Sequence, residues 1–285
     1  MFSAVIRYQF LQNAIVASVM ASIACGVIGV AIVEKKLVMM SGGIAHTAYG
    51  GVGLGYLMGF EPILGAFLFS ICAALGVGFV KRKGGAHTDV VIGLFWSFGM
   101  ALGILFIALM PGYPPDMSSY LFGSILSVTR GDIMLISSMT AVVALAVAAL
   151  FSYWKAYLFD EEFIAIIGIK TAILDYLLLM LIAMTVVALI RAVGIVLALA
   201  LLTAPAAIAG MFASSLETRM VFSVILSNLF CIAGLWASYA LNIASGASIA
   251  IVAAACCFLA YAIRSVCRLQ GGKWRCLIPK KGLMK

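Results

Sequence analysis

The chain has 285 residues, of which 65% are apolar and only 10% are charged. A typical soluble domain has about 45–50% apolar and about 25% charged residues, so the composition excludes a soluble enzyme, a secreted disulfide scaffold and a disordered protein. A membrane-spanning helix uses about 20 apolar residues. The sequence therefore predicts an all-α fold, that of a polytopic helical membrane protein.

Apolar runs bounded by charged residues, proline or glycine predict nine transmembrane helices. Their ranges are 10–33, 37–58, 61–80, 90–110, 132–154, 172–190, 193–213, 220–241 and 247–266. Residues 116–129 are apolar in their centre but too short to cross a bilayer, so a re-entrant half-helix or a surface helix is expected there. We expect a single transmembrane domain over residues 1–267, followed by a basic tail over residues 268–285.

The positions of the Lys and Arg residues predict the orientation of these spans. Only Arg7, Arg130 and Arg191 fall in one set of alternate loops, and the rest of the 18 basic residues fall in the other set and in the tail. Because cytoplasmic loops carry an excess of Lys and Arg, the C-terminus is predicted to be cytoplasmic and the N-terminus outside. The net charge of +8 does not indicate a nucleic-acid partner, since the basic residues form no single face or stripe.

The second span is dense in glycine. Seven glycines lie between positions 42 and 59, namely Gly42, Gly43, Gly50, Gly51, Gly53, Gly55 and Gly59. Glycine costs about 1 kcal/mol relative to alanine in an exposed helix interior, whereas small residues at four-residue steps let helices approach closely in lipid. Close helix packing therefore explains most of these glycines.

Packing does not explain His46 in the same span. Its position ten residues beyond Lys36 places it about 15 Å deep, near the centre of the bilayer. Ionisable groups at that depth usually face the interior of a bundle or a water-filled path. Gly42 and Gly50 lie one turn away on the same helix face, and we expect them to leave open space around the imidazole. Three interpretations stay open: a metal ligand, a proton relay, or a satisfied histidine between helices.

The loop between the fifth and sixth spans begins with Asp160, Glu161 and Glu162. Acidic residues favour a helix N-terminus, and Gly168 is placed to end the helix. We expect a short amphipathic helix within residues 158–170, lying across the cytoplasmic face. It is either a docking element for a motor protein or a plain interfacial helix.

Other polar residues near the predicted span ends give weaker signals. Glu61, Asp116 and Asn242 lie at the outer ends and are candidates for an entry vestibule. Asp175 and Arg191 bracket the sixth span near the interfaces, where anchoring is expected. No phosphate-binding GxxxxGK[ST] loop, HExxH or GxSxG motif occurs. The chain is therefore not expected to be an enzyme.

Several segments together resemble one family, the membrane permeases of zinc- and manganese-uptake ABC transporters. The second-span signature of that family is similar to GGIAHTAYGGVGLGY, and its fourth-span signature to TDVVIGLFWSFGMALGILFI. The coupling helix of the family resembles FDEEFIAIIGIKT, and its last hairpin resembles SYALNIASGASIAIVAA. The resemblance covers nearly the whole chain in order and agrees with the predicted topology.

The resemblance implies the membrane subunit of a divalent-metal importer in the plasma or inner membrane of a prokaryote. His46, flanked by Gly42 and Gly50, falls on the pathway histidine of the family. The ATPase-coupling positions are Asp160, Glu161, Glu162, Phe163 and Gly168. The implied partners are two copies of an ATP-binding subunit, which hydrolyse the ATP, an extracytoplasmic metal-binding protein, a second permease copy and membrane lipid. The metal is cargo rather than a stably bound cofactor.

Two departures from the family bear on the metal. Many members carry an Asp at the position of Gly42 and another in the last extracellular loop, where this chain has Asn242. Imidazole suits zinc better than manganese, which prefers oxygen ligands, so zinc is favoured, with manganese or iron as alternatives. The rival function is a secondary cation/proton transporter that uses His46, although such carriers usually place more carboxylates within their spans.

Overall fold

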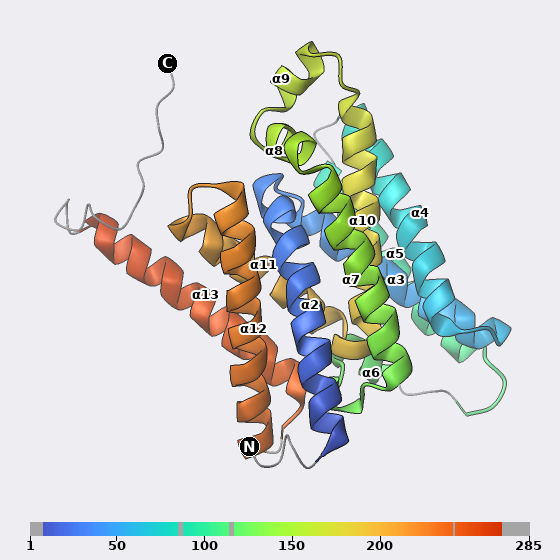
Figure 1. The fold of residues 1–285 in the computed structure, drawn as a ribbon. Helices are drawn as coiled ribbons and strands as arrows, with labels where there is room; N and C mark the ends of the chain where they lie inside the picture. The colour runs from blue at the N-terminus through green and yellow to red at the C-terminus, as the bar shows by residue number, and fades with distance from the viewer. Residues whose placement is uncertain (1–7, 85–87, 114–116, 242, 270–285) are drawn as a thin grey trace.

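The computed structural model describes residues 8–84, 88–113, 117–241 and 243–269, and every regular element in these ranges is a helix (Figure 1). In these ranges the long helices are α2 (Gln9–Glu34), α3 (Val38–Met58), α4 (Pro62–Lys83), α5 (Thr88–Ala108), α7 (Arg130–Ala149), α10 (Thr171–Val193), α11 (Ile195–Phe212), α12 (Leu216–Leu241) and α13 (Ser245–Leu269). The short elements are α6 (Ser118–Phe122), the 3-10 turn η1 (Ile125–Ser127), α8 (Phe151–Phe159) and α9 (Glu161–Ile166). Each predicted span overlaps one long helix, which confirms the all-α, polytopic fold.

Helix α3 differs from the other long helices because protein encloses it. Among the described residues, eight helices are long and apolar enough to cross a membrane, and α3 is not one of them. It packs against α4, α5 and α10, and all its residues from Met40 to Gly53 are buried. A helix covered by other helices needs no apolar surface toward lipid, and small residues let those neighbours come close. This location explains how α3 accommodates its glycines and His46.

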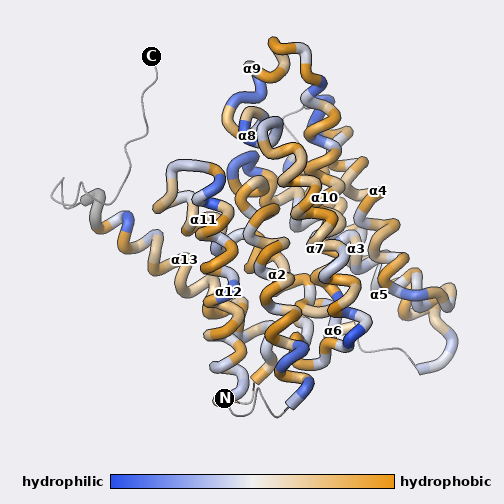
Figure 2. The backbone as a smooth tube through the Cα atoms, in the orientation of Figure 1, coloured by the Kyte–Doolittle hydropathy of each residue, from blue (hydrophilic) through white to orange (hydrophobic). Residues whose placement is uncertain are grey.

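Charged residues gather at the two ends of the bundle, while apolar residues dominate the lengths of the helices (Figure 2). The end that carries α8 and α9 is called the α9 end below, and the opposite end, with α6, is called the α6 end (Figure 1). Ion pairs at the α9 end are Lys35–Glu161, Lys81–Asp175, Lys155–Glu217 and Arg219–Glu34. At the α6 end, Arg191 binds Glu61 and Asp132. The paired basic residues therefore lie mostly at the α9 end, as expected from their distribution among the loops, and the cytoplasmic location of this end stays a prediction.

The fifth predicted span, 132–154, is wrong at its C-terminal end. Helix α7 stops at Ala149, and α8 begins after a break at Leu150 (φ −107°, ψ 22°). The apolar run continues through the break because α8 buries Trp154 and Tyr157 in the α9 end of the bundle. The run therefore contains two helices with different environments, which hydropathy alone does not separate.

The segment 116–129 does not form the single helix that its apolar centre suggested. Within its described residues, α6 and η1 are separated by Gly123, which has a φ of +65°. A side chain at Gly123 would meet the backbone of Val193 and Gly194, at the end of α10. Glycine is required there for both the positive φ and the close approach. The chain therefore turns against α10 at this point instead of continuing as a helix.

Candidate functional site

The centre of the candidate site is His46, in the middle of the enclosed helix α3. Its side chain is 8% exposed. The Nδ1 atom is buried and has no hydrogen-bond partner among the described residues. An unsatisfied buried polar atom costs about 1–3 kcal/mol, so its retention calls for a reason. Because Nδ1 makes no hydrogen bond within the described residues, the structure does not support the interpretation of a satisfied histidine between helices.

The indole of Trp96, on α5, stacks on the imidazole of His46. The ring centroids are 4.1 Å apart and the planes differ by 14°. A Cβ atom placed on Gly42 would lie 3.1 Å from the Trp96 ring, so the indole occupies the space beside Gly42. The expectation of open space around the imidazole is therefore wrong on this side, because the indole of Trp96 fills that space.

Gly50, one turn beyond His46, does not leave open space either. A Cβ atom placed on it would lie 2.7 Å from the carbonyl oxygen of Gly99 on α5 and 3.3 Å from the ring of Phe69 on α4. Gly53 lies equally close to Gly103, with 2.6 Å between the added Cβ and the Gly103 oxygen. These glycines bring the backbones of α3 and α5 together on the far side of the histidine.

The other glycines of α3 confirm the packing interpretation, with one exception. A side chain on Gly51 would meet the backbone of Gly65, which joins α3 to α4. The hydroxyl of Thr47 donates to the carbonyl oxygen of Gly43 at 2.7 Å and lies 3.1 Å from that of Phe95 on α5. Gly59 is different, since it ends α3 with a φ of +73° and has no atom within 4 Å of an added Cβ. Its role is that of a helix C-cap.

Trp96 was missed in the sequence although its position held a signal. Helices α3 and α5 both begin at the α9 end, His46 is eight residues into α3, and Trp96 is eight residues into α5. Equal numbers of residues at 1.5 Å per residue give equal depths. Recognising that the second and fourth spans are parallel neighbours would have placed the two rings at the same level.

His46 does not belong to a preformed chelating cluster. Within the described ranges, no group of three or more His, Cys, Asp or Glu residues is close enough to hold a metal ion. One imidazole nitrogen supplies a single ligand, whereas tightly held transition metals usually have three or four protein ligands. Within the described residues, His46 therefore offers one imidazole ligand and no cluster.

The outer-vestibule candidates have different outcomes. Glu61 is not a free carboxylate, because it pairs with Arg191, and the Nε atom of Arg191 lies 2.6 Å from Asp132. Asp132 also forms a capping box with Thr129 at the start of α7. The structure therefore joins Glu61 to the anchoring residue Arg191 and adds Asp132, which sequence reasoning did not select. Asp116 and Asn242 lie outside the described residues.

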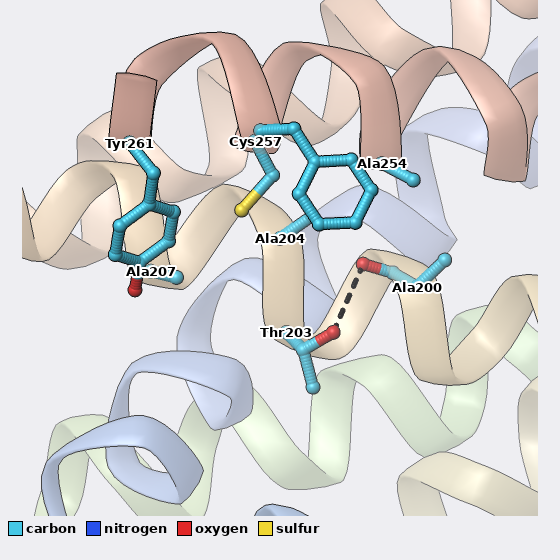
Figure 3. Close-up of a pocket in the computed structure, with 8 residues that line it drawn as sticks. Ala200, Thr203, Ala204, Ala207, Ala254, Cys257 and Tyr261 are labelled. Carbon is cyan, nitrogen blue, oxygen red and sulfur yellow. Dashed lines mark hydrogen bonds between the residues drawn. The ribbon is translucent and has the colours of Figure 1, made fainter. Parts of the chain in front are cut away.

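The structure also contains an apolar pocket that does not include His46. A pocket of about 280 Å³ lies between α11 and α13 (Figure 3). Its lining residues are Ala200, Thr203, Ala204, Ala207, Ala254, Cys257, Phe258 and Tyr261. The Thr203 hydroxyl donates a hydrogen bond to the carbonyl oxygen of Leu199, one turn earlier in α11, at 2.8 Å. Its lining has one thiol, that of Cys257, and no His or carboxylate, so the pocket does not have the set of ligands of a divalent-metal site.

The acidic segment at the α9 end forms a shorter helix than the expected range 158–170. Helix α9 covers Glu161–Ile166, and Gly168 follows with a φ of +89°. Glu161 pairs with Lys35, whereas Ile166 and Ile167 are 83% and 58% exposed. Asp160 comes directly before the helix and Glu162 is exposed in its first turn; the side chain of Phe163 lies outside the described residues. Together with α8, this helix projects from the end of the bundle (Figure 1).

Comparison with known proteins agrees with this architecture. Residues 7–264 match the ABC 3 transport family. The chain is 42% identical over 259 residues to an uncharacterized membrane protein of Synechocystis sp., covering 91% of this chain and 92% of that protein. It is 35% identical over 258 residues to the manganese transport system membrane protein MntC of Listeria monocytogenes, covering 90% and 91%.

A solved structure is similar over almost the whole fold. It is the structure of PsaBC from Streptococcus pneumoniae in complex with Fab, with a TM-score of 0.84 and 28% identity, and the match covers 94% of this chain and 98% of that one. The match of the family over most of the sequence confirms the resemblance to metal-type ABC permeases and places the chain in the cell membrane as a multi-pass protein. This chain belongs to the ABC 3 transport family.

Proposed function

We propose that this chain is the membrane-spanning subunit of an ATP-driven importer of divalent metal ions. The observation that carries the proposal is the buried Nδ1 of His46, which has no hydrogen-bond partner in the described part of the chain, in a chain of the ABC 3 transport family. An imidazole nitrogen that makes no hydrogen bond within the described residues, in the middle of an enclosed helix, is available to a passing ion. The family match favours this function over a secondary cation/proton transporter.

Two considerations point to different metals. The similar proteins with assigned cargo are named as manganese transport proteins, whereas a single imidazole without a neighbouring carboxylate suits zinc better. We take manganese as the first cargo to test, because a transient ligand on a path sets selectivity less strictly than a closed site does. Zinc and iron serve as the competing cargoes.

The ion path requires more than one chain. His46 contributes one ligand, so a homodimer would bring two imidazoles to the path. An extracytoplasmic metal-binding protein would deliver the ion, and the basic tail after α13 would contact anionic lipid. Gly42 and Gly50 would serve the path indirectly, since they hold Trp96 and the α5 backbone against α3. Glu61 would contribute to the outer vestibule as part of its ion pair with Arg191.

The α8–α9 segment is the proposed docking site for two ATP-binding subunits. It projects from the end of the bundle that is predicted to be cytoplasmic, and it exposes Ile166 and Ile167 beside its acidic start. Exposed apolar side chains rimmed by polar ones are typical of protein interfaces. Reversal of the charges of Asp160, Glu161 and Glu162 is expected to weaken recovery of the ATP-binding subunit in a pull-down from detergent. Recovery of the ATP-binding subunit at the wild-type ratio would show that the acidic residues are not part of the docking site.

Uptake by proteoliposomes tests the path. The chain is reconstituted with its ATP-binding subunit and binding protein, and ATP-dependent uptake of radioactive manganese, zinc and iron is compared. His46→Ala is expected to abolish uptake without reducing assembly, because it removes the only ligand identified on the path. His87→Ala, which changes the other histidine of the chain, is the matched control. Unaltered uptake by His46→Ala would refute the role of His46, and uptake without ATP would favour the secondary transporter.

A further inference from the structure

The turn between α2 and α3 is short and tightly bonded. Only three residues separate the two helices, and Lys36 has a φ of +57°, which is unusual for a residue other than glycine. The backbone N–H of Leu37 donates to the carbonyl oxygen of Ile32 at 2.8 Å, and the Leu37 side chain is buried. A strained turn that is held by several contacts resists bending. A force on this turn is therefore passed to the first turn of α3.

Lys35, the first residue of this turn, contacts both short helices of the docking segment. Its Nζ atom lies 2.6 Å from a carboxylate oxygen of Glu161 on α9 and 3.7 Å from the ring centroid of Tyr157 on α8. The Lys35 side chain is only 12% exposed. The Glu161 side chain is 44% exposed, so solvent screens the ion pair in part, whereas the contact with the buried ring of Tyr157 is screened less. The ammonium group thus joins the docking segment to the start of α3.

Tyr157 provides a fixed support for this contact. Its side chain is fully buried, and its hydroxyl donates to Asp175 on α10. Asp175 in turn binds Lys81 at 2.6 Å and Arg82 at 3.6 Å, both on α4. Burial and the hydrogen bond to Asp175 raise the pKa of the Tyr157 hydroxyl, which keeps it protonated as a donor. Through Tyr157, helix α8 is therefore anchored to α10 and, by way of Asp175, to α4.

The residue before Lys35 ties the same turn to another helix. Glu34, the last residue of α2, binds Arg219 in the first turn of α12. Adjacent residues thus connect the end of α2 to α12 and to α9. Lys155 and Glu217 form a further pair between α8 and α12 at 3.0 Å, but both side chains are about half exposed. That exposed pair does not involve a residue of the α2–α3 turn.

We infer that Lys35 is a positioning residue that couples the docking segment to the transport path, because it carries a displacement of α9 through the α2–α3 turn to α3 and His46. The inference rests on the proposed function, in which an ATP-binding subunit docks on α8 and α9. His46 lies eight residues into α3, and α3 has no break between the turn and the histidine. A displacement of the first turn therefore shifts the imidazole with the helix.

The test measures manganese ions transported per ATP hydrolysed, in proteoliposomes that contain the chain, its ATP-binding subunit and its binding protein. Lys35→Met keeps the length of the side chain and removes its charge. We expect the complex to assemble and hydrolyse ATP, while the transport ratio falls by about 5-fold or more, the lower end of typical coupling between sites. Lys35→Arg should keep the wild-type ratio, and exchange of the two charges in Lys35→Glu/Glu161→Lys should restore part of it. Lys83→Met is the control, because Lys83 is an exposed lysine at the end of α4, outside the docking segment; this variant should leave the ratio unchanged.

The outcomes separate the inference from the proposed function. A wild-type ratio in Lys35→Met would overturn the role of Lys35 and leave the importer intact. Loss of assembly in Lys35→Met would also overturn it, since Lys35 would then act in docking or folding. An equal fall of the ratio in Lys83→Met would show a general effect of charge at the α9 end and would overturn the specific role. If the assembled wild-type complex takes up no manganese, zinc or iron, the proposed function itself fails.

Discussion

The close approach of α3 and α5 beside His46 predicts a penalty for a single methyl group. In Gly50→Ala, the added Cβ would lie 2.7 Å from the Gly99 oxygen, whereas ordinary contacts begin at 3.4 Å. The backbones would have to separate by roughly 0.3–0.7 Å, and overpacking of this kind costs about 1–3 kcal/mol. Alanine also favours the helix by about 1 kcal/mol relative to glycine, which hides part of the penalty.

Gly93→Ala on α5 removes that ambiguity. Gly93 is also within a helix, but an added Cβ there has no atom within 4 Å, so only the gain in helix preference remains. The difference between the two variants isolates the overpacking, about 1–3 kcal/mol. At about 2–4 °C per kcal/mol, Gly50→Ala should melt about 2–12 °C below Gly93→Ala in detergent. Equal melting temperatures would refute the close contact of α3 and α5 at Gly50.

Two further predictions concern a buried charge and the stacked rings. Asp175→Ala leaves Lys81 without its buried partner and should destabilise the chain by about 1–3 kcal/mol. This value lies between those of surface and fully buried ion pairs, because Lys81 is partly exposed. Thermal melting against Lys155→Met checks this, and equal stability would contradict it. Trp96→Ala in a His87→Ala background should speed modification of His46 by diethyl pyrocarbonate, measured by mass spectrometry, because the indole covers one face of the imidazole. Trp96→Phe should be intermediate, and an unchanged rate in Trp96→Ala would show that the ring does not shield His46.

Local patterns in the sequence predicted the features that depend on neighbours along the chain. Apolar runs located every long helix, and the glycines of the second span marked the closest helix contacts, such as Gly51 against Gly65. The sequence also selected His46, which the structure buries inside the bundle, while its role on an ion path stays a prediction. These predictions succeeded because hydropathy, glycine spacing and helical rise are local properties.

The features that were missed depend on pairing between distant segments. The ion pair of Glu61 was missed because its partner, Arg191, is 130 residues away. The break at Leu150 lies within a continuous apolar run and is decided by where Trp154 and Tyr157 find a buried site. Local composition contains no information about which ends of a bundle meet. Such contacts can be identified only once the arrangement of the helices is known.

The packing around His46 limits the motions that can uncover it. Gly43 meets Ile92 on one side of the stacked rings, and Gly50 meets Gly99 on the other. Because these contacts involve backbone and short side chains, sliding of α3 along α5 would bring atoms into overlap. We therefore expect α3 and α5 to move as one body, with Trp96 as a wall behind the imidazole. Access to His46 would then open on the face that the indole does not cover, when other helices move relative to this pair.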